Sequence, residues 1–181
     1  MARIIQLKTE RLLLRQWKDE DLSPFAQINA DPEVMKYFPN ILTTEESNQF
    51  ADRLRDIIQN RGWGLWALEL KDTGEFIGYT GLHDIDDQLP FAPGIEIGWR
   101  LSKGFWGNGY ATEAAKEVLR FALISLQLEK VYSFTSKINE NSISVMEKIG
   151  MNNTDSDFNH PSLAYDHKPA KHVLFNVINE N

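Results

Sequence analysis

The chain has 181 residues, of which 42% are hydrophobic and 25% are charged, proportions that fit one folded domain and exclude a chain disordered throughout. Its formal net charge of −7 argues against general binding to nucleic acids or anionic membranes, and it is compatible with a cationic partner or with solubility alone. Cysteine is absent, which excludes disulfides, thiolate metal sites and cysteine nucleophiles.

The N-terminal segment predicts a strand and then helices. Residues 11–15 form an apolar run bounded by charge, which predicts a strand. Acidic residues at 19–21 suit the start of a first helix. Asp31-Pro32 signals a second helix start, because Asp is a good N-cap and Pro suits the first helical position. No apolar leader segment appears before residue 17, so we expect a cytoplasmic protein.

A further helix is indicated by a capping box and an apolar stripe. The spacing of Thr43 and Glu46 matches a capping box, and Gly62 is a stop signal. Between them the sequence carries apolar residues at helical spacing. These are Phe50, Leu54, Ile57 and Ile58.

The middle of the chain predicts three strands and a long helix. Residues 66–70 and 75–82 read as strands joined by the hairpin turn 71–74. Residues 95–101 read as the next strand. An amphipathic helix is expected over about 109–125, with its apolar face formed by Ala111, Ala115, Val118, Leu119 and Ala122.

The C-terminal part adds a strand at 131–136, a helix at 142–148 closed by Gly150, and a strand at 172–178. Strands and helices thus alternate along the second half of the chain. The order predicts an α/β (α+β) fold with one mixed sheet, and we expect a single domain over residues 1–181.

Three glycines lie between the strand at 95–101 and the helix that follows it: Gly104, Gly107 and Gly109. A Walker A loop needs Lys-Ser/Thr after its last glycine, and here Tyr110-Ala111 follows. The dinucleotide fingerprint has the reverse glycine spacing. The remaining interpretations are a loop whose backbone N–H groups hold a pyrophosphate at a helix N-terminus, or a plain turn.

Motifs in a fixed order span nearly the whole chain. Together they resemble the GNAT acetyltransferase superfamily, and within it the RimJ/RimL-like protein N-terminal acetyltransferases. The motifs are Thr-Glu-Arg-Leu-Leu-Leu-Arg at 9–15, Phe-Ile-Gly-Tyr-Thr-Gly-Leu at 76–82, Glu-Ile-Gly-Trp-Arg-Leu at 96–101, Trp-Gly-Asn-Gly-Tyr-Ala-Thr-Glu-Ala at 106–114, Asn-Glu-Asn-Ser at 139–142 and Val-Met-Glu-Lys-Ile-Gly-Met at 145–151.

The resemblance implies a GNAT-like fold, with a mostly antiparallel sheet flanked by helices and splayed central strands. It implies acetyl-CoA as co-substrate and direct acetyl transfer to a primary amine in a ternary complex. One departure is Gly104, where the superfamily usually has Gln or Arg. The cofactor-binding residues implied are Trp99, Arg100, Leu101, Gly104, Phe105, Trp106, Gly107, Asn108, Gly109, Tyr110, Ala111, Thr112, Asn139 and Ser142.

The resemblance also implies catalytic roles. Glu96 is the candidate general base, acting through water, and an outward-facing strand carboxylate is the alternative interpretation. His83 is an alternative base because histidine titrates near neutral pH. Ser142 matches the position that can protonate the leaving thiolate, or it is simply a serine in the first turn of a helix. Asn139 can contact the cofactor or serve as a cap, and capping is also expected of Asn141.

A protein α-amine is the favoured acceptor, because its pKa of about 7.7–8.0 lies below that of lysine, about 10.4. A polyamine, an antibiotic or a non-catalytic acyl-CoA-binding regulatory role are the alternatives. We expect Tyr37-Phe38-Pro39 to form a mobile rim of the acceptor site. No metal is expected, since His160, His167 and His172 lack metal-site spacing. The expected partners are acetyl-CoA and the amine, with a homodimer as an alternative to the monomer, and neither nucleic acid nor membrane.

Overall fold

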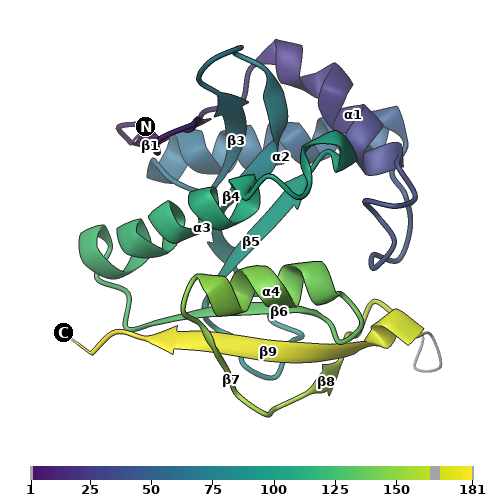
Figure 1. Cartoon of the computed structure of the whole chain (residues 1–181), viewed down its shortest axis with the longest axis vertical. Helices are drawn as coiled ribbons and strands as arrows, with labels where there is room; N and C mark the ends of the chain where they lie inside the picture. The colour runs from purple at the N-terminus through teal and green to yellow at the C-terminus, as the bar shows by residue number, and fades with distance from the viewer. Residues whose placement is uncertain (1, 164–167, 181) are drawn as a thin grey trace.

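The computed structural model describes residues 2–163 and 168–180, which form one nine-stranded sheet with helices on both faces (Figure 1). The strand order is β1-β2-β3-β4-β5-β6-β9-β7, and β8 also pairs with β9. Every pair is antiparallel except β5 and β6, which confirms the predicted mixed, mostly antiparallel sheet. The strands are β1 (Leu7–Lys8), β2 (Leu12–Arg15), β3 (Leu65–Leu70), β4 (Phe76–Asp84), β5 (Ile95–Leu101), β6 (Lys130–Ser136), β7 (Asn152–Asn153), β8 (Phe158–Asn159) and β9 (Lys171–Ile178).

Two pairs of helices cover the two faces of the sheet (Figure 1). The helices are α1 (Leu22–Ala30), α2 (Thr44–Arg61), α3 (Tyr110–Arg120) and α4 (Glu140–Lys148). Helices α3 and α4 lie over β4, β5 and β6, and α1 and α2 lie behind them over β3 and β4. The core lies between these layers, and its largest fully buried side chains include Trp66, Phe25, Ile97 and Val118.

Helix α2 begins and ends where its sequence predicts. The Thr43 hydroxyl accepts from the Glu46 N–H at 3.2 Å, and the Glu46 carboxylate accepts from the Thr43 N–H at 2.7 Å. Gly62 closes the helix with a φ of +89°. The predicted apolar stripe is wrong at Ile57, which is exposed on the solvent side of the helix.

The helix predicted at Asp31-Pro32 does not form. Asp31 instead ends α1, its carboxylate accepts from the Glu33 N–H at 2.9 Å, and successive turns follow up to Phe38. Pro39 explains the difference, because a residue before proline is disfavoured in the helical region and fewer than two turns would fit. The helix predicted over 109–125 is α3, and its last turn, Phe121–Ser125, is π-helical.

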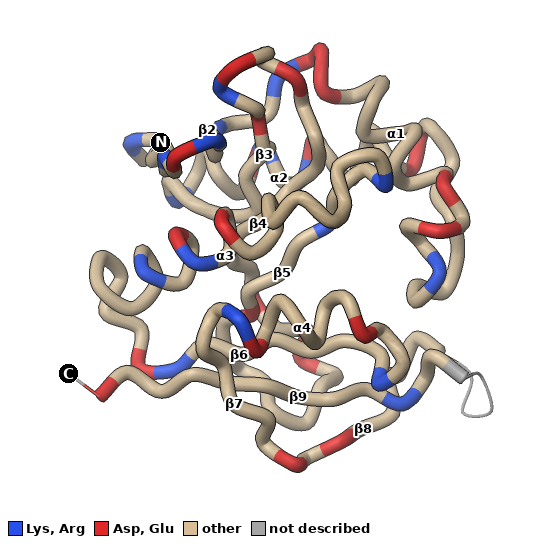
Figure 2. Tube along the Cα trace, in the orientation of Figure 1, with Lys and Arg blue, Asp and Glu red and all other residues tan. Residues whose placement is uncertain are grey.

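Charged residues of both signs are interleaved along the part of the chain that the structure describes, and no element there gathers the basic residues (Figure 2). Within residues 2–163 and 168–180, no helix combines the length and the apolar character needed to cross a membrane. The two-residue strands β1, β7 and β8 have no counterpart among the predicted elements.

Candidate functional site

The glycine loop, residues 102–109, connects β5 to α3 and is held by its own side chains. A 3₁₀ turn at Lys103–Phe105 opens it. The Asn108 Nδ2 then donates to the carbonyls of Phe105 at 3.2 Å and Trp106 at 3.1 Å. Gly107 and Gly109 have φ values of +74° and +77°, which other residues rarely adopt. The glycines are therefore needed for the shape of the loop.

The end of this loop presents backbone donors to open space. Gly109 is the N-cap of α3 and has no side chain with which to cap it. The first N–H groups of a helix, here at Tyr110, Ala111 and Thr112, have no partner within the helix. Apart from its chain neighbours, a Cβ at Gly104 or Gly107 would meet no described atom within 4 Å. Free N–H groups at the positive end of the helix dipole suit a phosphate group.

The two central strands separate beside this loop. Strands β5 and β6 pair at Glu96 alone in the described part of the chain. The carbonyl of Ile97 still points towards β6, where the Ser133 hydroxyl donates to it at 3.0 Å. Alternate residues of β5 direct their backbone groups to the same side, so Trp99 and Leu101 direct theirs into the gap. The predicted splay is thus present, and it presents the backbone of two residues predicted to bind the cofactor.

Asn139 and Ser142 lie across the gap from the loop, because the carboxyl ends of parallel strands meet at one edge. The Asn139 Oδ1 accepts from the Ser142 N–H at 3.3 Å, and its Nδ2 donates to the hydroxyls of Thr135 at 2.9 Å and Ser142 at 3.1 Å. Asn139 is therefore the N-cap of α4, and the prediction that Asn141 caps it is wrong. Since Ser142 Oγ accepts this bond, its own proton is free to be donated.

Glu96 and His83, the two candidate bases, lie opposite each other on β5 and β4. Glu96 is buried, and its Oε2 lies 3.1 Å from the His83 Nε2, while the His83 Nδ1 lies 3.1 Å from the Asp84 carbonyl. Burial alone lowers the pKa of His83, but the charge and hydrogen bond of Glu96 outweigh it and raise that pKa above its ordinary value. The sequence left these two residues as alternatives, and the fold joins them in one acid–base pair.

Space beside this pair is kept open by Gly98. A Cβ on Gly98 would lie 3.8 Å from the His83 Nε2 and 3.9 Å from the Glu96 Oε1. Apart from its chain neighbours, it would meet no other described atom within 4 Å. A small group can therefore approach both polar atoms over the strand.

Arg100 lies on the same face of β5 as Glu96 and Gly98, because alternate residues of a strand share a face. Its side chain is only 8% exposed, and its Nη1 donates to the Asn29 Oδ1 of α1 at 2.8 Å. The Arg100 backbone pairs with Tyr79 of β4. Its side chain thus lies on the α1 and α2 side of the sheet, so the structure does not bring it to the glycine loop with the other predicted cofactor-binding residues.

A cluster around Glu113 ties the start of α3 to the turn between β1 and β2, and sequence reasoning missed it. The Glu113 carboxylate accepts from the Thr9 hydroxyl at 2.6 Å, the Arg11 N–H at 2.8 Å and the Arg11 Nε at 2.7 Å. The Arg11 guanidinium stacks on the Tyr110 ring at 4.3 Å. It would lie 3.5 Å from a Cβ at Gly109. The signal was available, since these residues lie in two of the motifs that carry the resemblance.

The segment 37–39, expected to form a rim of the acceptor site, contacts the segment after β6. The Tyr37 hydroxyl donates to the Ile138 carbonyl at 3.3 Å, so the loop after α1 reaches across to the segment after β6. The rings of His160 and His172 are in contact, with centroids 5.0 Å apart and planes tilted by 42°. Burial lowers the pKa of both, that of His172 to about 4, and they therefore stay neutral at physiological pH. His167 lies outside the described residues.

The comparisons with known proteins agree with this geometry. The family model for the acetyltransferase (GNAT) domain matches residues 11–152. The Bacillus subtilis protein YkkB is 32% identical over 90% of this chain and 95% of its own length. The FsC-acetyl coenzyme A-N(2)-transacetylase of Aspergillus fumigatus is 33% identical over 84% of this chain and 67% of its own.

Among solved structures, a GNAT-family acetyltransferase from Bacillus anthracis has the same fold, with a TM-score of 0.81 and 24% identity over 98% of this chain and all of that one. The single-domain fold expected from the resemblance is confirmed, whereas the finer assignment to the RimJ/RimL-like branch stays a prediction. Members of this family use acetyl-CoA. With the family model covering most of its length, the chain belongs to the GNAT acetyltransferases and is an N-acetyltransferase.

Proposed function

We propose that this enzyme moves the acetyl group of acetyl-CoA to the α-amine of a protein N-terminus. The observation that carries the proposal is where the gap between β5 and β6 ends. It starts at the glycine loop and closes at Glu96, where the strands pair again. The five residue steps between Leu101 and Glu96 make the gap about 16 Å long. A pantetheine arm that enters at the loop thus leads its thioester to the acid–base pair.

Two parts of the cofactor, the pyrophosphate and the pantetheine arm, have matching groups along this path. The loop amides from Phe105 to Ala111 and the N-terminus of α3 suit the pyrophosphate. The backbone of Trp99 suits the amides of pantetheine, as does the N–H of Leu101, whose carbonyl already accepts from the Trp106 indole at 3.0 Å. The carboxamide of Asn139 holds Ser142, so we assign it a positioning role beside the cofactor.

The acid–base pair suits removal of a proton from the amine. The amine nitrogen attacks the thioester carbonyl carbon, the C–S bond breaks, and the nitrogen loses a proton. Glu96 receives that proton through water over Gly98, and the neighbouring His83 imidazole takes it up when neutral. The leaving thiolate takes a proton from the Ser142 hydroxyl, which the bond from Asn139 leaves free to donate, and the serine regains a proton from solvent water.

A panel of amines tests the acceptor class. Release of free thiol from acetyl-CoA would be followed with peptides that carry a free α-amine, with the same peptides blocked at the α-amine but carrying lysine, and with polyamines and aminoglycosides. We expect turnover only with the free α-amine. Turnover of the small amines alone would show that the acceptor is a small amine and not a protein N-terminus. Tight CoA binding without thiol release on any amine would indicate a non-catalytic acyl-CoA-binding domain.

A further inference from the structure

The side chain of Arg100 carries a buried positive charge that no acidic group neutralises. Within the described ranges, no carboxylate lies within 4 Å of its guanidinium. Among the described residues, its one hydrogen bond goes to a neutral oxygen, that of Asn29, and its Nε is buried without a partner. Buried charges in proteins are normally paired, because removing a charge from water is costly.

The guanidinium is held in place by aromatic rings instead of by counter-charge. Its central carbon lies 4.3 Å from the centre of the Phe38 ring, 5.3 Å from that of Tyr79 and 5.9 Å from that of Phe50. Aromatic faces attract a cation, but they leave its N–H donors free at the edge of the guanidinium plane. The arrangement fixes the orientation of the guanidinium. Its Nη1 already donates to Asn29 and its Nε is buried, so the Nη edge is the donor fork left for a ligand.

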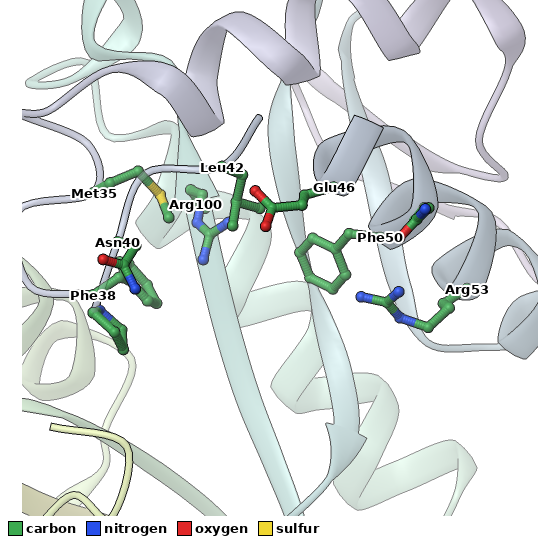
Figure 3. Close-up of a pocket in the computed structure, with 10 residues that line it drawn as sticks. Met35, Phe38, Asn40, Leu42, Glu46, Phe50, Arg53 and Arg100 are labelled. Atoms are coloured by element: carbon green, nitrogen blue, oxygen red, sulfur yellow. The ribbon is translucent and has the colours of Figure 1, made fainter. Parts of the chain in front are cut away.

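This fork points into a cavity of about 430 Å³ between α2 and the loop after α1 (Figure 3). Arg53 of α2 adds a second positive charge at its exposed side. Glu46 is the one carboxylate in its lining, and that carboxylate is used to cap α2 through the Thr43 N–H at 2.7 Å. The cavity therefore combines excess positive charge with free donors, which suits a carboxylate.

The cavity and the acid–base pair lie along one strand face. Gly98, over which we place the reacting amine, is two residues from Arg100, a separation of about 7 Å. Successive Cα atoms of a peptide are about 3.8 Å apart, so a side chain on the second residue of an acceptor spans this distance. A peptide bound with its α-amine over Gly98 brings that side chain to Arg100.

We propose that Arg100 is a specificity-determining residue that binds a carboxylate of the acceptor, and that the enzyme prefers protein N-termini with an acidic second residue. This inference rests on the proposed function for the position of the amine. Asn29 is its positioning residue, because it holds the guanidinium from α1. The aromatic rings hold the guanidinium in this orientation when no acceptor is bound.

Matched peptides test the inference directly. Two amidated peptides that differ only in Asp or Asn at the second position would be compared as acceptors by thiol release. We expect wild-type enzyme to have a kcat/KM about 10- to 100-fold higher for the Asp peptide, mainly through KM, since a hydrogen-bonded charge pair contributes this much to binding. Arg100→Gln should abolish the preference, and Arg100→Lys should restore part of it.

A control variant and a second measurement keep the result decisive. Arg120→Gln removes the same charge from an exposed position on α3 and should leave the preference unchanged. Binding of the two acetylated product peptides to the CoA complex would be measured by calorimetry. Equal affinity of both peptides for wild-type protein, or a preference that persists in Arg100→Gln, would overturn the inference. Carboxylate-dependent binding without turnover of any α-amine would instead overturn the proposed function and leave this site standing.

Discussion

Replacing Glu113 by glutamine should weaken both the fold and cofactor binding, because this carboxylate joins the start of α3 to the turn between β1 and β2. It accepts three hydrogen bonds, and only the one from the Arg11 Nε lies at the surface, where the Arg11 side chain is 41% exposed. Bonds to a charged acceptor contribute roughly 1.5–3 kcal/mol each when shielded, and the exposed ion pair contributes less than about 1 kcal/mol. Glutamine keeps one acceptor oxygen, so we expect a loss of about 2 kcal/mol.

The size of the protein converts this loss into a measurable shift. A domain of 150–250 residues loses about 2–4 °C in Tm per kcal/mol, so Glu113→Gln should melt about 4–8 °C lower. The hydrogen bonds outweigh burial and lower the pKa of Glu113. Glu113 therefore contributes to the free energy of unfolding above pH 4.5, its ordinary pKa. This contribution is lost as the pH falls through the lower pKa that Glu113 has in the folded protein. Urea unfolding at pH 7 and below pH 4.5 would show the difference between the two proteins shrinking in acid.

Glu117→Gln is the matched control, one turn further along α3. The Glu117 carboxylate pairs with Arg120 at 2.7 Å, but the Arg120 side chain is 53% exposed, so its loss should cost about 0.5 kcal/mol or less. Glu113→Gln should also raise the KM for acetyl-CoA while kcat changes little, since the contacts of Glu113 with Thr9 and Arg11 orient the N-terminus of α3. Equal unfolding free energies for the two variants, or a difference that is independent of pH, would refute this account of Glu113.

The acid–base pair and its surroundings give three more predictions. Glu96→Gln should lower kcat at least about 100-fold. The acidic limb of the pH–rate profile should also move to lower pH, because the carboxylate that raises the pKa of His83 is gone. An acidic limb that does not move would exclude the pair of His83 and Glu96 as the origin of that limb. Ser142→Ala should lower kcat with little change in acetyl-CoA affinity measured by calorimetry, and an unchanged kcat would exclude Ser142 as the proton donor. Gly98→Val should raise the KM of the amine several-fold and leave CoA binding intact, because its side chain fills the space beside His83; weakened CoA binding would contradict this placement of the acceptor.

The sequence predicts best what neighbouring residues decide. The capping box of α2 and its closing glycine involve contacts only a few residues apart, so the helix appears where expected. The turns after Asp31 were missed because Pro39 limits the segment from its far end. Strands β1, β7 and β8 each depend on a partner strand and carry too few residues to produce a periodic pattern.

The features of the candidate site also differ in how far neighbouring residues determine them. The glycine loop is predictable because its backbone conformation depends on glycine itself. The pair of His83 and Glu96 depends on the register of β4 against β5, which no spacing in the sequence specifies. The bond between Arg100 and Asn29 joins residues 71 positions apart, so an arginine within a cofactor motif was assigned to the cofactor.

The geometry of β5 would let one strand serve both substrates in the proposed reaction. One backbone edge of β5 faces the gap between β5 and β6. The backbone groups of Trp99 on this edge can bind the extended pantetheine arm. Its side chains at Glu96 and Arg100 project at right angles to that edge, towards α1 and α2. A substitution on this face can therefore change the acceptor without disturbing the cofactor path. In the proposed reaction the thioester carbonyl and the amine would meet beside Glu96, the one described residue of β5 that pairs with β6.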